Sequence, residues 1–389
     1  MSLKTKFYKI LLLTLATLLV LSQLPFAYRR YKLRELSLNI SSVNASHHQN
    51  EIDNAYSELV GVLHVHSFLG GHSTGTFSDI IAAAQANHLQ FVIMTEHTEK
   101  DYDTAEMTLK GIHGGVLFIN GNEVSEPNGD RMLMIPGASP LIRVVAYPET
   151  FKNWDSQAFD AVEIYNVFTN AKKVNPIFAL FDSLWSRRAY GDLLFATFYA
   201  RPGEDLEQWD QALSSKRLVG TAGNDAHANI GFSINDSAGK TLFGMKLDPY
   251  ETSFRLVRLH VLVPRNSSER TPDPDFLLDS IRQGHCFIGF DLFGDTSGFR
   301  FSGQNGIDKK IQGDELKLTP QTSVAVDVPV IARVLILKDG KKFHESVAAT
   351  HLDVPVTETG VYRVEIYLPQ LGSLVSGKPW IISNPIYIR

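Results

Sequence analysis

The stretch Leu59-Val60-Gly61-Val62-Leu63-His64-Val65-His66 decides the fold, because an apolar run there ends in two histidines. Its composition is typical of a buried strand. Residues i and i+2 of a strand point to the same side, so we expect His64 and His66 to present two imidazoles on one face. That spacing makes the pair a candidate metal site.

A second fragment, Asn224-Asp225-Ala226-His227, repeats this spacing after the apolar run Leu218-Val219-Gly220-Thr221. Here the i and i+2 positions hold a carboxylate and an imidazole. Imidazole and carboxylate are the ligands that suit zinc, manganese and iron. Two such pairs are hard to explain as packing, so the sequence indicates a metal-dependent hydrolase.

Further apolar runs between residues 57 and 292 also end in polar side chains. Residues 91–95 precede Glu96 and His97, residues 116–119 precede Gly121-Asn122-Glu123, residues 144–146 precede Tyr147, and residues 161–164 precede Tyr165 and Asn166. Helical stretches separate these runs, such as residues 77–88 behind the capping sequence Thr76-x-x-Asp79. The alternation predicts a parallel sheet covered on both faces, as in an α/β barrel. Active sites of such barrels form where the strands end, so we expect these side chains to meet there.

The sequence changes character in residues 293–389. Runs such as 324–328, 331–336 and 361–367 read as strands, with glycines between them and no convincing helix. This pattern predicts a small antiparallel β-sandwich that follows the barrel.

Residues 10–24 are almost wholly apolar and are flanked by basic residues on both sides. Their length is close to the ~20 residues that cross a bilayer. Pro25-Phe26-Ala27 is a poor cleavage sequence, which favours an uncleaved membrane anchor over residues 1–35 rather than a removed signal peptide. We expect the large domain that follows to lie outside the cytoplasm. Residues 36–56, rich in Ser, Asn and His, predict a flexible linker.

The composition narrows the function classes. The 389 residues can form two ordinary domains or one large barrel with an appendage. A net charge of −5 gives no reason to expect a nucleic-acid partner. The single cysteine, Cys286, allows neither a disulfide framework nor a thiolate metal site, and we expect it to be a small buried apolar residue.

Five short motifs together resemble the PHP (polymerase and histidinol phosphatase) family of metallohydrolases in order and spacing. They are Leu63-His64-Val65-His66-Ser67, His72, Thr95-Glu96-His97, Gly121-Asn122-Glu123 and Asn224-Asp225-Ala226-His227. The end of the chain, Lys378-Pro379-Trp380-Ile381-Ile382-Ser383-Asn384-Pro385-Ile386, is similar to the tail of a PHP subgroup that includes carbamate-ester hydrolases. The resemblance covers residues 59–290 and implies a distorted (β/α)7 barrel with up to three metal ions.

The resemblance also implies which residues bind metal. One ion would be held by His64, His66, Glu123 and Asp225. Another would be held by His72, His97 and His227. Glu123 would bridge to a third, middle ion, which in the family is completed by two further histidines.

The chain departs from the family pattern at the middle ion. Tyr147, which precedes Pro148, stands where the first of the two histidines is usual, and no histidine lies between His113 and His227. Glu96 stands where the family usually has aspartate. We therefore expect two divalent ions of zinc, manganese or iron, with Tyr147 directing its hydroxyl towards the substrate.

A divalent ion with nitrogen and oxygen ligands lowers the pKa of bound water to ~7, so we expect a hydrolase that uses metal-activated hydroxide. The expected substrate is a small-molecule ester, with phosphoesters first. The alternatives are hydrolysis of carboxyl esters, carbamates or amides, or a metal-stabilised binding module without catalysis. The sequence identifies no catalytic acid, and it leaves Glu163 open between a site residue and a structural acceptor. We expect His260 and His285 to have structural roles.

Overall fold

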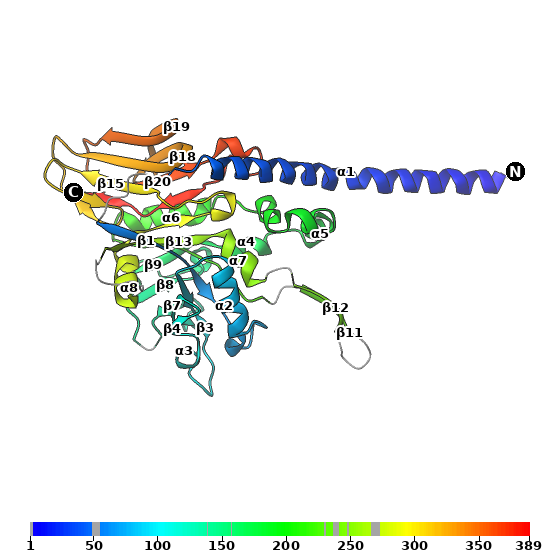
Figure 1. Cartoon of the computed structure of the whole chain (residues 1–389), viewed down its shortest axis with the longest axis horizontal. Helices are drawn as coiled ribbons and strands as arrows, with labels where there is room; N and C mark the ends of the chain where they lie inside the picture. Colours follow the sequence, from blue (N-terminus) through cyan, green and yellow to red (C-terminus); the bar gives the residue numbers. More distant parts are fainter. Residues whose placement is uncertain are drawn as a thin grey trace.

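The protein is a mixed α/β molecule with one long helix that extends away from its body (Figure 1). A computed structural model describes residues 3–48, 55–137, 139–156, 158–228, 231–235, 241–246, 249–265 and 273–389. The helices are α1 (Leu3–Ala45), α2 (Phe77–Ala86), α3 (Thr104–Met107), α4 (Val167–Lys172), α5 (Pro176–Tyr190), α6 (Gly203–Leu213), α7 (Tyr250–Leu256) and α8 (Pro274–Gln283). Short 3-10 turns are η1 (Phe68–Gly70), η2 (Pro148–Thr150), η3 (Asp192–Thr197), η4 (Asp291–Phe293) and η5 (Pro369–Leu371).

The first half of the body is built around strand β1 (Tyr56–Val65). Strands β2 (Phe91–Met94) and β5 (Val116–Ile119) continue from it in parallel, as the sequence predicts. On its other side lie β13 (Arg258–Pro264) and β14 (Cys286–Gly289), both antiparallel to their neighbours. Their apolar side chains are buried on both faces, which is typical of the centre of an α/β protein.

A six-stranded sheet lies next to these strands. Its order is β10-β9-β8-β7-β6-β3, with β3 (Glu96–His97), β6 (Asn122–Ser125), β7 (Arg131–Ile135), β8 (Ile142–Val145), β9 (Ala161–Asn166) and β10 (Val219–Gly223). Strands β8, β9 and β10 are parallel. Strand β7 is antiparallel to both of its neighbours, because residues 122–135 form a hairpin that the sequence pattern does not predict.

Both edge strands of the six-stranded sheet, β3 and β10, meet the larger sheet that contains β1. Strand β2 leads directly into β3 through Thr95, and a bridge joins Val65 at the end of β1 to Ala226, just after β10. The amide of Asn224 also donates to the carbonyl of Leu63 at 2.9 Å. Among the described residues these contacts do not complete a continuous ladder, so the strands form no closed barrel.

The C-terminal residues form mostly antiparallel strands, as predicted, but they do not form a separate sandwich. They are β15 (Arg300–Gln304), β16 (Lys309–Ile311), β17 (Glu315–Leu316), β18 (Ser323–Lys338), β19 (Lys341–Pro355), β20 (Gly360–Tyr367), β21 (Ile381–Ser383) and β22 (Ile386–Ile388). Strand β21 pairs with β14, so these strands extend the sheet that contains β1. Strands β17 and β22 pair with each other in parallel. In the described chain this sheet has fourteen strands and ends at β4 (Gly111–His113), while β11 (Gly231–Asn235) and β12 (Thr241–Lys246) pair as a two-stranded ribbon.

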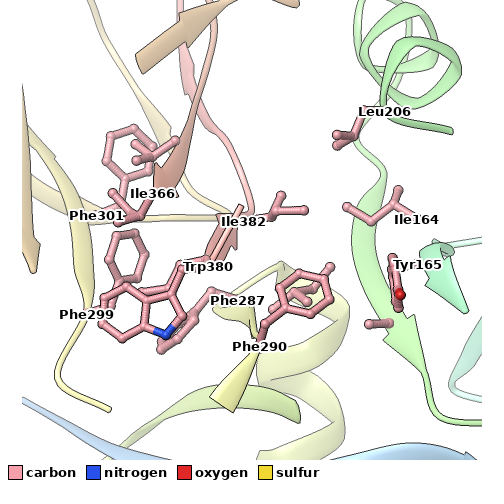
Figure 2. Packing of buried hydrophobic residues seen from close by; sticks show 14 of the residues in the cluster. Ile164, Tyr165, Leu206, Phe287, Phe290, Phe299, Phe301, Ile366, Trp380 and Ile382 are labelled. Carbon is pink, nitrogen blue, oxygen red and sulfur yellow. The ribbon is translucent and has the colours of Figure 1, made fainter. Parts of the chain in front are cut away.

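One hydrophobic core crosses the predicted boundary at residue 292. Ile164, Tyr165 and Leu206 face Trp380 and Ile382 in the same cluster (Figure 2). The side chain of Asn384 reinforces this packing: its Nδ2 donates to the carbonyls of Gly220 at 3.0 Å and Cys286 at 2.8 Å. The chain therefore does not form two separately packed domains, because its two parts bury their apolar surfaces against each other.

Helix α2 begins with the N-terminal cap that the sequence predicts. The Thr76 side chain accepts from the amide of Asp79, and the Asp79 carboxylate accepts from the amide of Thr76, which is the predicted capping box. The helix buries Ile80, Ala83 and Ala84 against the sheet.

Helix α1 is long and apolar enough to cross a membrane, and the side chains of residues 5–22 are all exposed. The predicted flexible linker is wrong as far as Ala45, because the helix continues through residues 36–45. Leu33, Leu36 and Val43 are buried in the main core, so tertiary packing overrides the polar composition of this segment. Residues 49–54 of the predicted linker lie outside the described residues.

Candidate metal centre

Six of the seven predicted ligands meet where four strands end. His64 and His66 come from the end of β1, and His97 comes from β3. Glu123 lies on β6, while Asp225 and His227 follow β10. The polar side chains that follow successive strands are thus brought together, as the strand pattern predicts.

The first group of ligand atoms surrounds one point. His64 Nε2 lies 3.3 Å from Glu123 Oε2 and 3.5 Å from Asp225 Oδ1, and His66 Nε2 lies 3.5 Å from each of the same two oxygens. Bonds of about 2.1 Å to a tetrahedral ion place its ligand atoms about 3.4 Å apart. The four predicted ligands of the first ion therefore have the spacing that such an ion requires.

The second group contains His66 where the predicted set for the second ion has His72. Ligand atoms of His66, His97 and His227 lie within 4.8 Å of one another. The His66 ring centroid is 4.5 Å from that of His97 and 4.2 Å from that of His227. His72 is exposed and meets the His97 ring edge-on at 4.8 Å, so it borders this group from the loop after η1.

The backbone at both ligand pairs is unusual. His64 has φ of 69° and Asp225 has φ of 47°, in the left-handed region that side chains rarely adopt. The pairing register of β1 with β2 shifts between Leu63 and Val65 at the same point. Simple strand alternation therefore does not explain the convergence of these side chains, since each chain segment bends at its first ligand. Such conformations cost about 1–3 kcal/mol each and are concentrated at functional sites.

Within the part of the chain that the structure describes, several buried polar atoms in the cluster have no hydrogen-bond partner. They are Nδ1 and Nε2 of His66 and Oδ1 of Asp225. Burial of an unpaired polar atom costs about 1–3 kcal/mol, and native structures rarely leave several together. A cation held between His66 Nε2 and Asp225 Oδ1, which lie 3.5 Å apart, would satisfy both of these atoms, so the residues fit a divalent metal ion.

Four members of the cluster, His66, His97, Glu123 and Asp225, have charge states that suit a metal ion. Burial lowers the pKa of His66 to about 3 and that of His97 to about 4, which keeps both imidazoles neutral with a free lone pair. Burial opposes ionisation of Glu123, but its neighbours His64, His66 and His97 outweigh that effect and lower its pKa to about 2. Burial likewise opposes ionisation of Asp225, but His64, His66 and His227 outweigh that effect and lower its pKa.

His64 is held in position by Glu163, whose role the sequence left open. His64 Nδ1 lies 2.9 and 3.0 Å from the two carboxylate oxygens of Glu163, which leaves Nε2 to face Glu123. Burial opposes protonation of His64, but Glu163 and Asp225 outweigh it and raise its pKa well above the usual value. A carboxylate behind a metal-binding histidine commonly fixes its tautomer and orientation.

Glu96 faces away from the cluster. Its oxygens accept from the amide of Ser67 at 2.9 Å, the hydroxyl of Ser67 at 2.6 Å and the hydroxyl of Thr108 at 2.8 Å. This side chain therefore holds the loop that follows β1, and its departure from the family pattern leaves the ligand group intact.

Tyr147 and Arg131 stand beside the two carboxylates. The hydroxyl of Tyr147 donates to Asp225 Oδ2 at 2.9 Å. Burial, together with Asp225, Glu123 and Glu163, raises the pKa of Tyr147, so the phenol stays protonated. Arg131 Nη1 lies 3.5 Å from Glu123 Oε1 and its side chain is 41% exposed.

Sequence reasoning missed Arg131 and did not assign Asn166. Arg131 opposes Ser125 in the β6–β7 hairpin, two positions along β6 from Glu123, so the hairpin register brings it to the site. Asn166 Nδ2 donates to Glu163 Oε2 at 3.1 Å and to Asp225 Oδ2 at 3.3 Å. Its place at the end of β9 was the signal that could have identified it.

The remaining predicted structural roles are confirmed. His260 lies between Glu58 and Asp291, with Nδ1 2.8 Å from the first carboxylate and Nε2 3.2 Å from the second. His285 Nε2 lies 2.9 Å from Asp314 Oδ1, and Cys286 is buried and free.

Comparisons with known proteins identify no family. No family model matches the chain, and no curated protein matches it. A similar solved structure is the crystal structure of PsfC from Pseudomonas syringae PB-5123. It has 15% sequence identity and a TM-score of 0.38, over 60% of this chain and 92% of that chain. A likeness of this size supports no conclusion about fold or function.

Proposed function

We propose that the protein is a metal-dependent hydrolase of ester bonds, with phosphoesters as its first substrate class. The observation that carries the proposal is the spacing of 3.3–3.5 Å among the ligand atoms of His64, His66, Glu123 and Asp225. That spacing matches a tetrahedral ion, and no other described atom pairs with Nε2 of His66, which faces this point.

In this proposal the first ion is held by these four residues, and the second by His97 and His227 with His72 beside them. His227 Nδ1 lies 3.0 Å from the carbonyl of Asp225, which leaves its Nε2 as the ligand atom. Such ions, when bound, lower the pKa of water and polarise an ester oxygen. We further propose that the strands around the site form the distorted barrel of the PHP family, since the two sheets meet at both edges.

In this proposal the partly exposed guanidinium of Arg131 donates to the substrate, and Tyr147 turns its one proton from Asp225 Oδ2 towards a substrate oxygen. A guanidinium and a protonated phenol favour an acceptor with two or more partly charged oxygens. A phosphoryl group presents such oxygens, and their negative charge increases as water attacks. This donor pair supports phosphoesters over carboxyl esters and carbamates.

The experiment is metal analysis and activity of the purified full-length protein with aryl phosphates, phosphodiesters, acetates and carbamates. We expect it to copurify with divalent metal and to hydrolyse phosphoesters. We expect Asp225→Ala to lose metal and at least about 100-fold in activity, because a ligand and its charge are removed. Asp327→Ala, which removes an exposed partner of His351, is the matched control and should change neither. Full metal content in Asp225→Ala would show that Asp225 is not a ligand.

A further inference from the structure

Helix α5 lies at the base of the exposed apolar part of α1 (Figure 1). Trp185 Nε1 donates to Gln23 Oε1 at 3.1 Å, and the ring of Phe181 stacks on Phe26 at 5.2 Å. An ion pair between Arg29 and Asp182 follows one helical turn further on. Because the apolar run of α1 ends at Leu24, a bilayer around that run places α5 at the membrane surface.

The outer face of α5 is apolar. Ile177, Leu180 and Leu184 recur at helical spacing, and their exposed fractions are 64%, 49% and 71%. Soluble surfaces rarely gather large apolar side chains in this way, and such a patch marks a surface that contacts a membrane or a partner. The position of α5 beside the apolar part of α1 identifies the membrane as that contact.

A cavity of about 640 Å³ is lined by Ala179 and Leu180 of α5 and also by Asn224, Asp225 and Ala226, the segment that carries a ligand of the metal centre. The rest of its walls is largely apolar and comes from α4, η3, α7 and their neighbours, with Phe168, Phe195 and Phe198 among them. The Phe168 ring also lies 5.8 Å from that of His227, which places this wall directly beside the ligands.

We propose that the substrate is a membrane phospholipid whose hydrocarbon chain occupies this cavity while its phosphoester lies at the metal centre. This inference rests on the proposed function for the reaction itself. In that reaction a water oxygen forms a bond to phosphorus, the phosphorus–oxygen bond to the leaving alcohol breaks, and the alcohol takes up the proton released by water. A soluble polar ester would leave the apolar walls of the cavity in contact with water, whereas a lipid chain removes them from it.

The first test compares alkyl 4-nitrophenyl phosphates with methyl, octyl and hexadecyl chains, using the metal-loaded full-length protein in lipid nanodiscs. The leaving group is the same throughout, so only the chain changes. We expect kcat/KM to rise with chain length by about tenfold or more from methyl to hexadecyl, since each buried methylene favours binding.

Partitioning of long chains into the nanodisc also raises the apparent rate, and a cavity variant separates the two effects. Ala179→Phe fills the cavity, whereas Ala189→Phe on the same helix is a matched control at an exposed position outside it. We expect the preference for long chains to fall about tenfold in Ala179→Phe and to persist in Ala189→Phe, with metal content unchanged in both. Ala171→Phe fills the cavity from α4 and should reproduce the effect.

The second test does not depend on turnover. A phosphatidic acid with a diazirine in its acyl chain is incorporated into vesicles with the protein, irradiated, and the labelled peptides are identified by mass spectrometry. Labelling of α4, η3 and α7 supports the proposal even if no ester is hydrolysed, in which case the proposed reaction alone fails. Labelling confined to α1 and the outer face of α5, or equal loss of methyl and hexadecyl turnover in both cavity variants, would overturn it.

Discussion

At the scale of single residues, the metal centre depends on two side chains that occupy costly backbone conformations. His64 and Asp225 both have positive φ, and each is the first member of its ligand pair. The sequence predicted that these pairs would converge, and they do. It could not predict the bends, because ideal strand alternation suggests the same convergence without any strain. Arg131 was missed for a related reason: its place beside Glu123 follows from a hairpin register and not from a motif.

Tyr147 provides a prediction that separates substrate binding from metal binding. Its hydroxyl contacts Asp225, and we propose that it turns from there to a substrate oxygen. We expect Tyr147→Phe to lower kcat roughly 10- to 100-fold, because one hydrogen bond to a charged oxygen contributes about 1–3 kcal/mol. Metal content should stay constant in the same preparation. Loss of metal instead would mean that the tyrosine positions Asp225 and does not contact the substrate.

His260 predicts a pH dependence of stability away from the metal centre. Burial opposes its charged form, but Asp291 and Glu58 outweigh that effect and raise its pKa to about 9. A raised pKa contributes stability that is fully present below the unfolded value of about 6.5 and is lost as pH rises through 9. The contribution is roughly 3 kcal/mol at its maximum.

We therefore expect urea unfolding of the full-length protein in nanodiscs to become easier between pH 7 and 10. His260→Gln should be less stable overall, because Glu58 and Asp291 lose their partner, and it should lack this part of the slope. Parallel pH profiles of the two proteins would show that His260 is uncharged in the folded state.

At the scale of elements, helix α1 shows where composition misleads. Residues 36–45 are rich in Ser and Asn, which favour caps and turns over helix interiors. Their helix forms because Leu36 and Val43 are buried, and because the side chain of Asn44 accepts from the amide of Asp295 at 3.0 Å. These partners lie about 250 residues away in the chain, so no local pattern contains them.

Helix α1 also predicts two different outcomes of truncation. Among the described side chains, those of residues 5–22, deletion of residues 1–22 removes only exposed ones, so the remaining protein should keep its thermal unfolding temperature in mild detergent. Deletion of residues 1–48 also removes Leu33, Leu36 and Val43 from the core. The loss of each of these side chains lowers the free energy of unfolding by about 2–5 kcal/mol. We expect the longer deletion to unfold at a temperature many degrees lower or to aggregate. Equal unfolding temperatures would show that α1 is a dispensable tether.

At the scale of the whole molecule, strand content and its alternation with helices were predictable, but the way the parts join was not. Each apolar run specifies a strand through its own residues. The pairing of β14 with β21 instead depends on residues 286–289 meeting residues 381–383, and the sequence contains no signal for that choice. For this reason the predicted domain boundary at residue 292 does not separate two hydrophobic cores. The sequence pattern changes there from alternating strands and helices to strands alone, but that change does not divide the core.

The rigid attachment of α1 has a consequence for how the protein encounters other molecules. If α1 anchors the protein in a bilayer as proposed, a body packed along the helix cannot swing freely around its anchor, so the cavity beside α5 stays at a fixed height above the lipid plane. Molecules that diffuse within that plane meet it in two dimensions, and their surface density sets the frequency of encounter. Molecules embedded in an opposing membrane lie outside its reach.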